Sequence, residues 1–277
     1  MPFLREKEPV RGVAHNVLPG ISRVVARNPG MMTYHGTNTY LIEGRDGLTV
    51  LDPGPDDPVH VRDILRAAGS TPIRWIALSH THRDHLGATS ELVSRTGALI
   101  YAFRHPAEAG FVPDFYLDEG SEAAGLVALH TPGHASDHLS FAHHVRGVGP
   151  ILFSGDHVMS WSSSVVDPPD GDMRAYCGSL KRLLDRDDVA YLPGHGALLG
   201  KPRVLVTEML AHRQARETEI VTRLTNSPAT VLELVELLYG GQHPILMRAA
   251  ERTVLAHLLK LRFEGVVQEY EAHWAPA

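Results

Sequence analysis

The sequence is short of cysteine and has no long apolar run. Cys177 is the only cysteine, so no intramolecular disulfide can form and the fold does not depend on an oxidising compartment. Apolar residues nowhere continue for the ~20 positions that a membrane-spanning helix needs. Residues 1–16 mix both charges with prolines, unlike a signal peptide. These absences argue against a disulfide-stabilised or membrane-spanning protein and predict a soluble protein of the cytoplasm.

The sequence also lacks an excess of positive charge and is poor in aromatic residues. Its net charge of −6 gives no overall attraction to nucleic acid or to an anionic membrane. Aromatic residues make up 6% of the chain, which leaves few rings for stacking on single-stranded bases. No Gly-x-Ser-x-Gly stretch is present, so nothing indicates a serine nucleophile of that type. The 43% of hydrophobic residues is typical of an ordinary globular protein.

Strand and helix patterns alternate through the first two thirds of the chain. Residues 39–52 form two apolar runs around Arg45-Asp46-Gly47, which predicts a hairpin. Asp57 and Pro58 then open a predicted helix that ends at Gly69. Further apolar runs separated by short helical patterns follow up to about residue 200. This alternation predicts a layered α/β architecture in which the hairpins make the sheets mixed rather than purely parallel.

The pattern changes after about residue 200, where helices dominate. We predict one helix over 203–224, a second that Ser227-Pro228 begins and that runs to Tyr239, and a third over 245–264, followed by a short strand or wing within 266–274. The division predicts two domains. They are a catalytic domain over 1–202 and a small helical, winged-helix-like domain over 203–277.

Three histidines and a carboxylate gather in the stretch ALSHTHRDHLGA, directly after an apolar run. They are His80, His82, Asp84 and His85. Alternate residues of an extended segment point the same way, so His80, His82 and Asp84 are expected to project together. His85 then points elsewhere if the backbone turns, which Gly87 would allow.

Similar residues end three other apolar runs: His134, Asp156 and His195. Strand ends at one edge of a sheet are held rigidly by the strands behind them, as a preorganised site requires. Imidazole and carboxylate ligands suit zinc, with manganese and iron as alternatives. His138, four residues after His134, is interpreted as a residue that pins this loop. The pattern predicts a metal site assembled from four separate turns.

This set of motifs resembles the metallo-β-lactamase superfamily, and the resemblance covers about residues 15–200. It implies a four-layer αββα sandwich and two divalent metal ions. The implied ligands are His80, His82 and His134 for one metal, Asp84, His85 and His195 for the other, and Asp156 between them. It also implies that Asp52, in LDPG, orients the ligands.

The implied reaction is hydrolysis by a hydroxide that the two metals share, with an ester, thioester or phosphodiester as substrate. We assign Asp84 the catalytic role of orienting this hydroxide and accepting its proton. The stretches TPGHASDHLSF, SGDHVM, YLPGHG and AAERTVLAHLLKLRFEGVV most resemble the β-lactamase-like protein 2 group. That group has a winged-helix-like tail and includes endoribonucleases specific for single-stranded RNA as well as polyketide thioesterases.

Three functions therefore remain open. A hydrolase of small esters or thioesters needs an apolar cleft, which residues 111–120 and 158–169 are candidates to line. A ribonuclease needs a basic or aromatic path for the strand. A non-catalytic regulator would bind nucleic acid through the helix over 245–264, whose arginines and lysine outnumber its acids only slightly. The apolar positions of this helix indicate internal packing or a homodimer contact instead, and binding to DNA is disfavoured.

Overall fold

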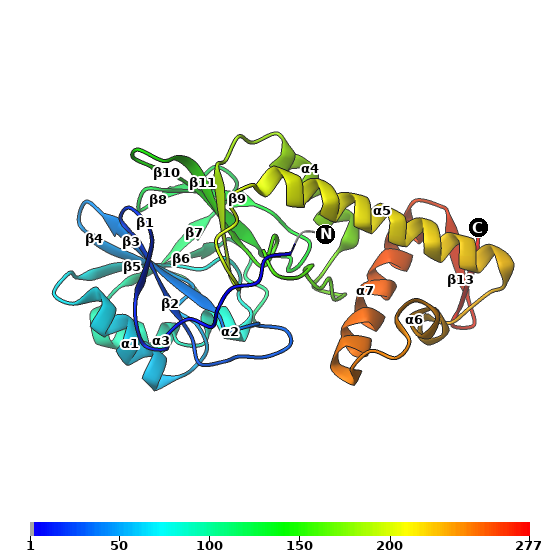
Figure 1. Ribbon diagram of the computed structural model, residues 1–277, viewed down its shortest axis with the longest axis horizontal. Coiled ribbons are helices and arrows are strands. Elements are labelled where there is room, and N and C mark those ends of the chain that lie inside the picture. The colour runs from blue at the N-terminus through cyan, green and yellow to red at the C-terminus, as the bar shows by residue number, and fades with distance from the viewer. Residues whose placement is uncertain (1–2) are drawn as a thin grey trace.

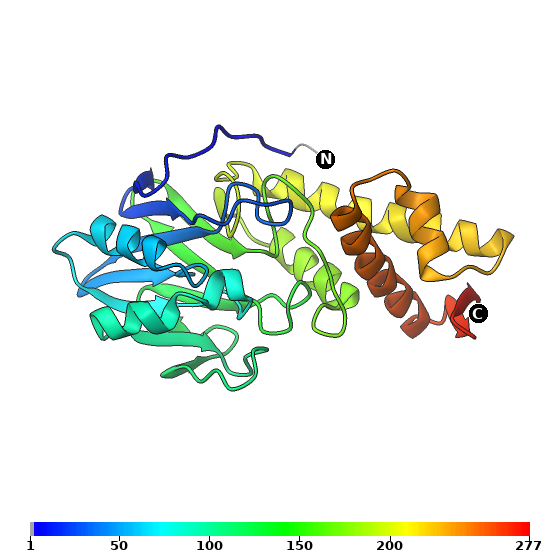
Figure 2. The same cartoon turned by 90° about the horizontal axis from the view of Figure 1, so that it is seen from below.

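The computed structural model describes residues 3–277 and forms two stacked sheets followed by a helical region (Figures 1 and 2). Residues 1 and 2, with which the predicted first domain begins, lie outside the described range. Figure 1 shows α5 (Pro202–Asn226) running from the sheets into the helical region. The two regions therefore share one continuous helix.

The first sheet has seven strands in chain order. They are β1 (His15–Leu18), β2 (Ile21–Val25), β3 (Asn38–Gly44), β4 (Gly47–Leu51), β5 (Ile73–Ala77), β6 (Leu99–Phe103) and β7 (Phe115–Leu117). Strands β1 to β4 pair antiparallel, and β4 to β7 pair parallel. The predicted hairpin is confirmed, since Gly44 pairs with Gly47 across the turn at Arg45-Asp46.

The second sheet has five strands in the order β12-β11-β10-β9-β8. They are β8 (Glu122–Ala123), β9 (Leu126–His130), β10 (Leu139–Val145), β11 (Gly149–Gly155) and β12 (Ala190–Pro193). Only the β11–β12 pair within this sheet is parallel. Both sheets are thus mixed, as predicted.

Helices cover the outer faces of the sheets and make up most of the C-terminal region (Figure 2). Besides α5 they are α1 (Pro58–Ala68), α2 (Arg83–Leu86), α3 (Thr89–Thr96), α4 (Met173–Leu184), α6 (Val231–Tyr239) and α7 (Pro244–Phe263). The Asp57 side chain caps α1 by accepting the Val59 N–H, and Gly69 ends it, as predicted. Within residues 3–277 no helix is long and apolar enough to cross a membrane.

Three apolar clusters hold these layers together, and a fourth lies in the C-terminal region. The first lies between the sheets and joins Tyr40 and Leu51 to Phe141 and Phe153. The second packs α1 and α3 on the outer face of the first sheet, and the third packs α4 and the start of α5 on the second sheet. The order helix, sheet, sheet, helix confirms the predicted αββα arrangement.

The fourth cluster forms the core of the C-terminal region and includes Leu224, Leu258 and Trp274. Because α5 contributes Leu205 to the third cluster and Leu224 to the fourth, the domain boundary at residues 202 and 203 stays a prediction. The apolar face of α7 packs largely inside this chain, and a homodimer likewise stays a prediction.

Two helix starts predicted from the sequence are wrong. Helix α6 begins after Thr230, not Ser227, because Thr230 and Glu233 form a reciprocal capping box. The sequence also predicts a helix over 179–185, but α4 already begins at Met173, because the Asp172 side chain accepts the Ala175 N–H and caps it.

The last segment forms a hairpin, β13 (Val267–Tyr270) with β14 (His273–Pro276), which is the wing of the two predicted alternatives and not a single strand.

Candidate metal centre

The turns that follow five strands meet at one edge of the two sheets. Asp52 follows β4, His80 follows β5, and His134 lies in the turn between β9 and β10. Asp156 follows β11 and His195 follows β12. The main chains also interlock there, because the Gly194 N–H donates to Gly155 O and the Asn38 N–H donates to Gly194 O. The sandwich therefore places side chains from both sheets against one another.

The motif itself changes from extended chain to helix halfway along. Asp84 and His85 lie in the short helix α2, so the expectation that Asp84 projects together with His80 and His82 from an extended segment is wrong. Glycine is required at position 87 for a different reason from the turn that the sequence suggested. Its φ of −54° is ordinary helical geometry, but a Cβ there would lie 2.4 Å from Asp56 N. Glycine permits this close approach of two backbones.

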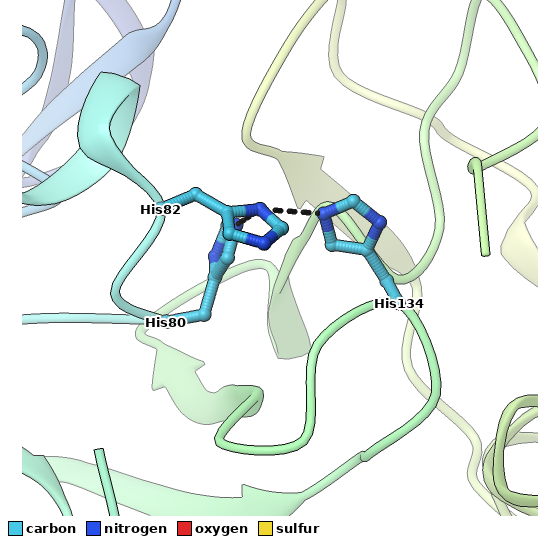
Figure 3. A group of neighbouring side chains, drawn as sticks. All are labelled: His80, His82 and His134. Carbon is cyan, nitrogen blue, oxygen red and sulfur yellow. Dashed lines mark hydrogen bonds between the residues drawn. The ribbon is translucent and has the colours of Figure 1, made fainter. Parts of the chain in front are cut away.

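His80, His82 and His134 turn their rings toward one another (Figure 3). His82 Nδ1 lies 2.9 Å from His80 Nε2 and 3.1 Å from His134 Nε2. The other nitrogen of His134, Nδ1, donates to Val165 O at 2.7 Å. His80 Nδ1 donates to Ser79 Oγ at 2.9 Å, because the Ser79 hydroxyl donates to Asp52. Both tautomers leave an unprotonated Nε2 facing His82.

A second group surrounds Asp84, His85 and His195. The Asp84 Oδ2 atom lies 3.3 Å from His195 Nε2 and 3.7 Å from His85 Nε2. His85 Nδ1 donates to Asp52 at 2.9 Å and His195 Nδ1 donates to Gly36 O at 3.2 Å, so each Nε2 again faces inward.

Asp156 lies between the two groups. Its Oδ2 atom is 3.7 Å from His134 Nε2 and 3.4 Å from His195 Nε2. Its Oδ1 atom is 3.5 Å from His85 Nε2. Asp156 Oδ1 and His85 Nε2 are both buried, and neither has a hydrogen bond to any described residue. This is the position that a ligand shared by two ions requires.

The protonation states of the first group suit a cation. Burial holds the pKa of His80 well below its ordinary value and lowers that of His134, so both are neutral near pH 7. Burial also lowers the pKa of His82, but Asp170, whose Oδ2 lies 3.5 Å from His82 Nε2, together with Asp156 and Asp84 more than offsets it, so the pKa is raised. Three ring nitrogens converge here, and they carry too few protons for each to be hydrogen-bonded to another. Such a set of nitrogens fits a divalent ion.

The second group has a surplus of negative charge. Burial disfavours charged histidines, but Asp156 and its neighbours raise the pKa of His85 well above its ordinary value and that of His195 to about 9. Burial likewise raises the pKa of Asp84, yet His85 and His195 more than offset it and leave it below its usual range. A divalent ion fits here by replacing the protons that these histidines otherwise carry.

Asp52 and His138 hold the surrounding loops. The Asp52 carboxylate accepts the Ser79 N–H and hydroxyl, both at 2.7 Å, besides His85. His138 Nε2 accepts the Asp156 N–H at 3.1 Å. Both positions match the orienting roles expected from the sequence, and the ligand and orienting assignments themselves stay predictions.

Several orienting groups were not found from the sequence. They are Ser79, Asp170 and the backbone carbonyls of Gly36 and Val165. Ser79 directly precedes the motif, so its position was a usable signal. Asp170 lies in DPPDGD, where no spacing distinguishes it, and a backbone carbonyl has no sequence signal at all.

Two arginines of the C-terminal helices hold the segment that carries Val165 and Asp170. Buried Arg213 of α5 donates to Ser164 O and Ser163 Oγ. Arg252 of α7 pairs with Asp167 and donates to Pro168 O. The C-terminal region thus contacts the segment that orients two of the predicted ligands.

A pocket of about 490 Å³, here the metal pocket, opens onto both groups. Its lining residues are Met32, Thr33, His82, Asp84, His134, Asp156, Met159, Val165, Asp167, Pro168, Pro169, Asp170, His195 and Arg252. The segment 158–169 thus lines it, as expected. Residues 111–120 contribute nothing to this lining, because they form β7 and its flanking loops.

Curated relatives match most of the chain. A Beta-lactamase-like protein 2 homolog of Caenorhabditis elegans is 29% identical over 97% of this chain and 91% of its own. An Atrochrysone carboxyl ACP thioesterase of Passalora fulva is 30% identical over 80% of this chain and 68% of its own.

Solved structures share the fold. A beta-lactamase domain protein from Burkholderia ambifaria has a TM-score of 0.84 and 22% identity, covering 98% of this chain and 96% of its own. A structure determined in a di-iron-bound form has a TM-score of 0.54 and 28% identity, covering 65% of this chain and 96% of its own. A metallo-beta-lactamase from Pseudomonas aeruginosa in a mono-zinc form has a TM-score of 0.59 and 23% identity, covering 76% of this chain and 98% of its own.

Two family models match in chain order. The Metallo-beta-lactamase superfamily model covers residues 32–195, more than half of the chain and all seven clustered residues. The beta-lactamase associated winged helix domain model covers residues 230–274. The chain therefore belongs to the metallo-beta-lactamase superfamily of metal-dependent hydrolases and carries a C-terminal winged helix domain.

Proposed function

We propose that this protein hydrolyses acyl esters, with thioesters as its principal substrates, at a site for two divalent metal ions. The lining of the metal pocket carries the proposal. Apart from the clustered residues it consists mainly of apolar side chains and two further aspartates, Asp167 and Asp170. Its one arginine, Arg252, is already paired with Asp167. Such a lining suits an acyl group better than a polyanion.

The relatives support a thioester. The Passalora fulva protein is named as a thioesterase acting on a carboxyl group carried by ACP, an acyl thioester. An Aspergillus chevalieri protein with the same name is 30% identical over 88% of this chain.

Asp84 is the residue we assign to proton transfer. Its contacts to His85 and His195 both involve Oδ2, which leaves Oδ1 as the atom to accept a proton from the attacking water. The side chain lines the metal pocket, so substrate can reach it. Two bound divalent ions would activate this water near neutral pH and polarise the acyl carbonyl. The products are a carboxylic acid and a thiol or alcohol.

Single-stranded RNA is the weaker candidate. Phosphodiester strands are held by basic and aromatic side chains. Apart from the clustered histidines, the residues that line the metal pocket include no aromatic ring, and the one arginine, Arg252, is paired with Asp167.

A nucleic-acid-binding regulator is also disfavoured. Three cations of α7 are engaged within the chain: Arg252 with Asp167, Lys260 with Glu217 and Glu264, and Arg262 with Glu269. They are therefore not free to contact phosphates.

The metal that we propose is zinc, with iron and manganese as alternatives. Five histidines and two carboxylates form a donor set that all three ions accept. Elemental analysis of protein purified without added metal distinguishes them. The cytoplasmic location stays a prediction.

The test is a substrate screen on metal-loaded protein. Acyl thioesters, carboxyl esters and a single-stranded RNA are incubated with the wild-type protein and with His82→Ala as the inactive control. We expect thiol release from thioesters that His82→Ala abolishes. Cleavage of RNA without turnover of any thioester or ester would overturn the proposal.

A further inference from the structure

A second pocket, here the interdomain groove, lies between the sheets and the C-terminal helices. It has a volume of about 250 Å³ and is bounded by the segments around Met31 and Trp161, by α5 and by α7. Much of its lining is apolar, and it includes Met159, Leu246 and Ala249.

The groove adjoins the metal pocket. Met32, Met159 and Val165 line both. Val165 lies closest to the clustered residues, because its carbonyl accepts the hydrogen bond from His134, one of the predicted ligands. The apolar groove therefore begins next to the place where the carbonyl of a substrate would lie.

The groove leaves apolar side chains open to solvent. Met31, Met32 and Leu246 remain 38%, 41% and 36% exposed. Methionine side chains adapt to ligands of varied shape, since they are flexible and polarizable. These three residues come from the loop before β3 and from α7, so the occupant would contact both regions of the chain.

We infer that the interdomain groove binds the hydrocarbon part of the acyl group, and that it selects substrates with medium or longer apolar acyl chains. The inference rests on the proposed function for the position of the carbonyl. The lining that the groove shares with the metal pocket favours a substrate over a protein partner. The C-terminal region thereby becomes part of the specificity site rather than a separate binding module.

The experiment measures kcat/KM for N-acetylcysteamine thioesters with acyl chains of increasing length, from acetyl to octanoyl. Burial of each further methylene is worth roughly three- to fourfold, so kcat/KM should rise along the series until the groove is filled. Ala249→Phe places a ring in the groove and should lower the octanoyl-to-acetyl ratio at least tenfold. Ala215→Phe is the matched control, because Ala215 lies exposed on α5 outside the groove.

Two further measurements keep the result independent of folding and of turnover. Leu246→Ser changes a side chain that is already exposed, and it should lower the octanoyl ratio a few-fold. Calorimetry with the thioether S-octyl-N-acetylcysteamine, which has no thioester bond to hydrolyse, should show binding to the wild-type protein and to Ala215→Phe. The same ligand should bind at least tenfold more weakly to Ala249→Phe.

The outcomes separate the two proposals. Thioester hydrolysis with no dependence on chain length, together with no binding of the thioether, overturns the groove assignment and leaves the proposed function intact. Binding of the thioether without turnover of any thioester overturns the proposed function and retains the groove as an apolar binding site.

Discussion

The metal edge of the sheets and the C-terminal region use their polar residues differently. At the metal edge His80, His85, Asp156 and His195 are buried, and partners from other loops orient several side chains, as Asp52 orients His85. In the C-terminal region the packed cluster is apolar, and charged groups such as Lys260 and Glu217 pair with one another. Burying unpaired polar groups is costly unless a ligand compensates.

This difference indicates a division of labour. At the metal edge two buried atoms without a hydrogen-bond partner within residues 3–277, His85 Nε2 and Asp156 Oδ1, face each other at 3.5 Å, which is a feature of a reactive centre. The C-terminal region contributes Arg252 to the lining of the metal pocket and holds the segment before α4 through Arg213 and Arg252. It shapes the pocket without supplying a clustered residue.

His82→Ala should have the largest effect. It removes the nitrogen on which the other two rings of the first group converge, so we expect loss of metal from that group and no measurable turnover. Elemental analysis and thioester kinetics measure both. His144→Ala, at an exposed position in β10, is the control and should behave as the wild type. Unchanged turnover in His82→Ala would show that the cluster is not the reactive centre.

Asp84→Asn should come next. The amide keeps the shape of the carboxylate but cannot accept the proton, so kcat should fall roughly 10²-fold or more. Metal in the first group should be retained, because Asp84 contacts only residues of the second group. Asp46→Asn, at the exposed turn of the hairpin, controls for the change of charge. Wild-type turnover together with wild-type metal content would remove Asp84 from catalysis.

The same contrast explains which features of the site could be predicted from the sequence. His80, His82, Asp84 and His85 are adjacent in sequence and directly follow a strand, so their clustering could be predicted locally. The ends of apolar runs likewise pointed to Asp156. The sequence pattern suggests an extended segment in which alternate residues point the same way. This pattern could not predict that Asp84 groups with His85, because the chain becomes helical at Arg83.

Long-range contacts carried no comparable signal. The pairing of Arg252 with Asp167 joins residues 85 positions apart, and neither lies in a recognisable pattern. The same holds for α5, whose two halves belong to different apolar clusters although its sequence shows one uninterrupted helix. The cap at Asp57 was predicted, but the cap predicted at Ser227 is at Thr230, and the cap at Asp172 was not predicted.

Ser79→Ala tests whether orientation, rather than the ligands alone, distinguishes the metal edge. It removes the hydroxyl that joins His80 Nδ1 to Asp52. Loss of such a partner typically weakens metal binding about 10- to 100-fold, which competition with a chelator measures. Ser22→Ala removes a hydroxyl that bonds Asn16 in the first sheet and should leave the metal affinity unchanged. Equal affinities in the two variants would mean that the cluster holds its geometry without Ser79.

Arg252→Gln should have the smallest effect and bears on the C-terminal side of the comparison. Its pair with Asp167 is partly exposed, and such pairs contribute about 0.2–1 kcal/mol, at most roughly fivefold in an equilibrium. We expect metal affinity and KM to change within that range, because the pair holds the segment that carries Val165 and Asp170. Arg262 lies on the same helix as Arg252, and Arg262→Gln, which breaks the pair with Glu269 of β13, should change neither. If Arg252→Gln abolished metal binding as His82→Ala does, the C-terminal region would belong to the reactive centre itself, and the division between the two regions would not hold.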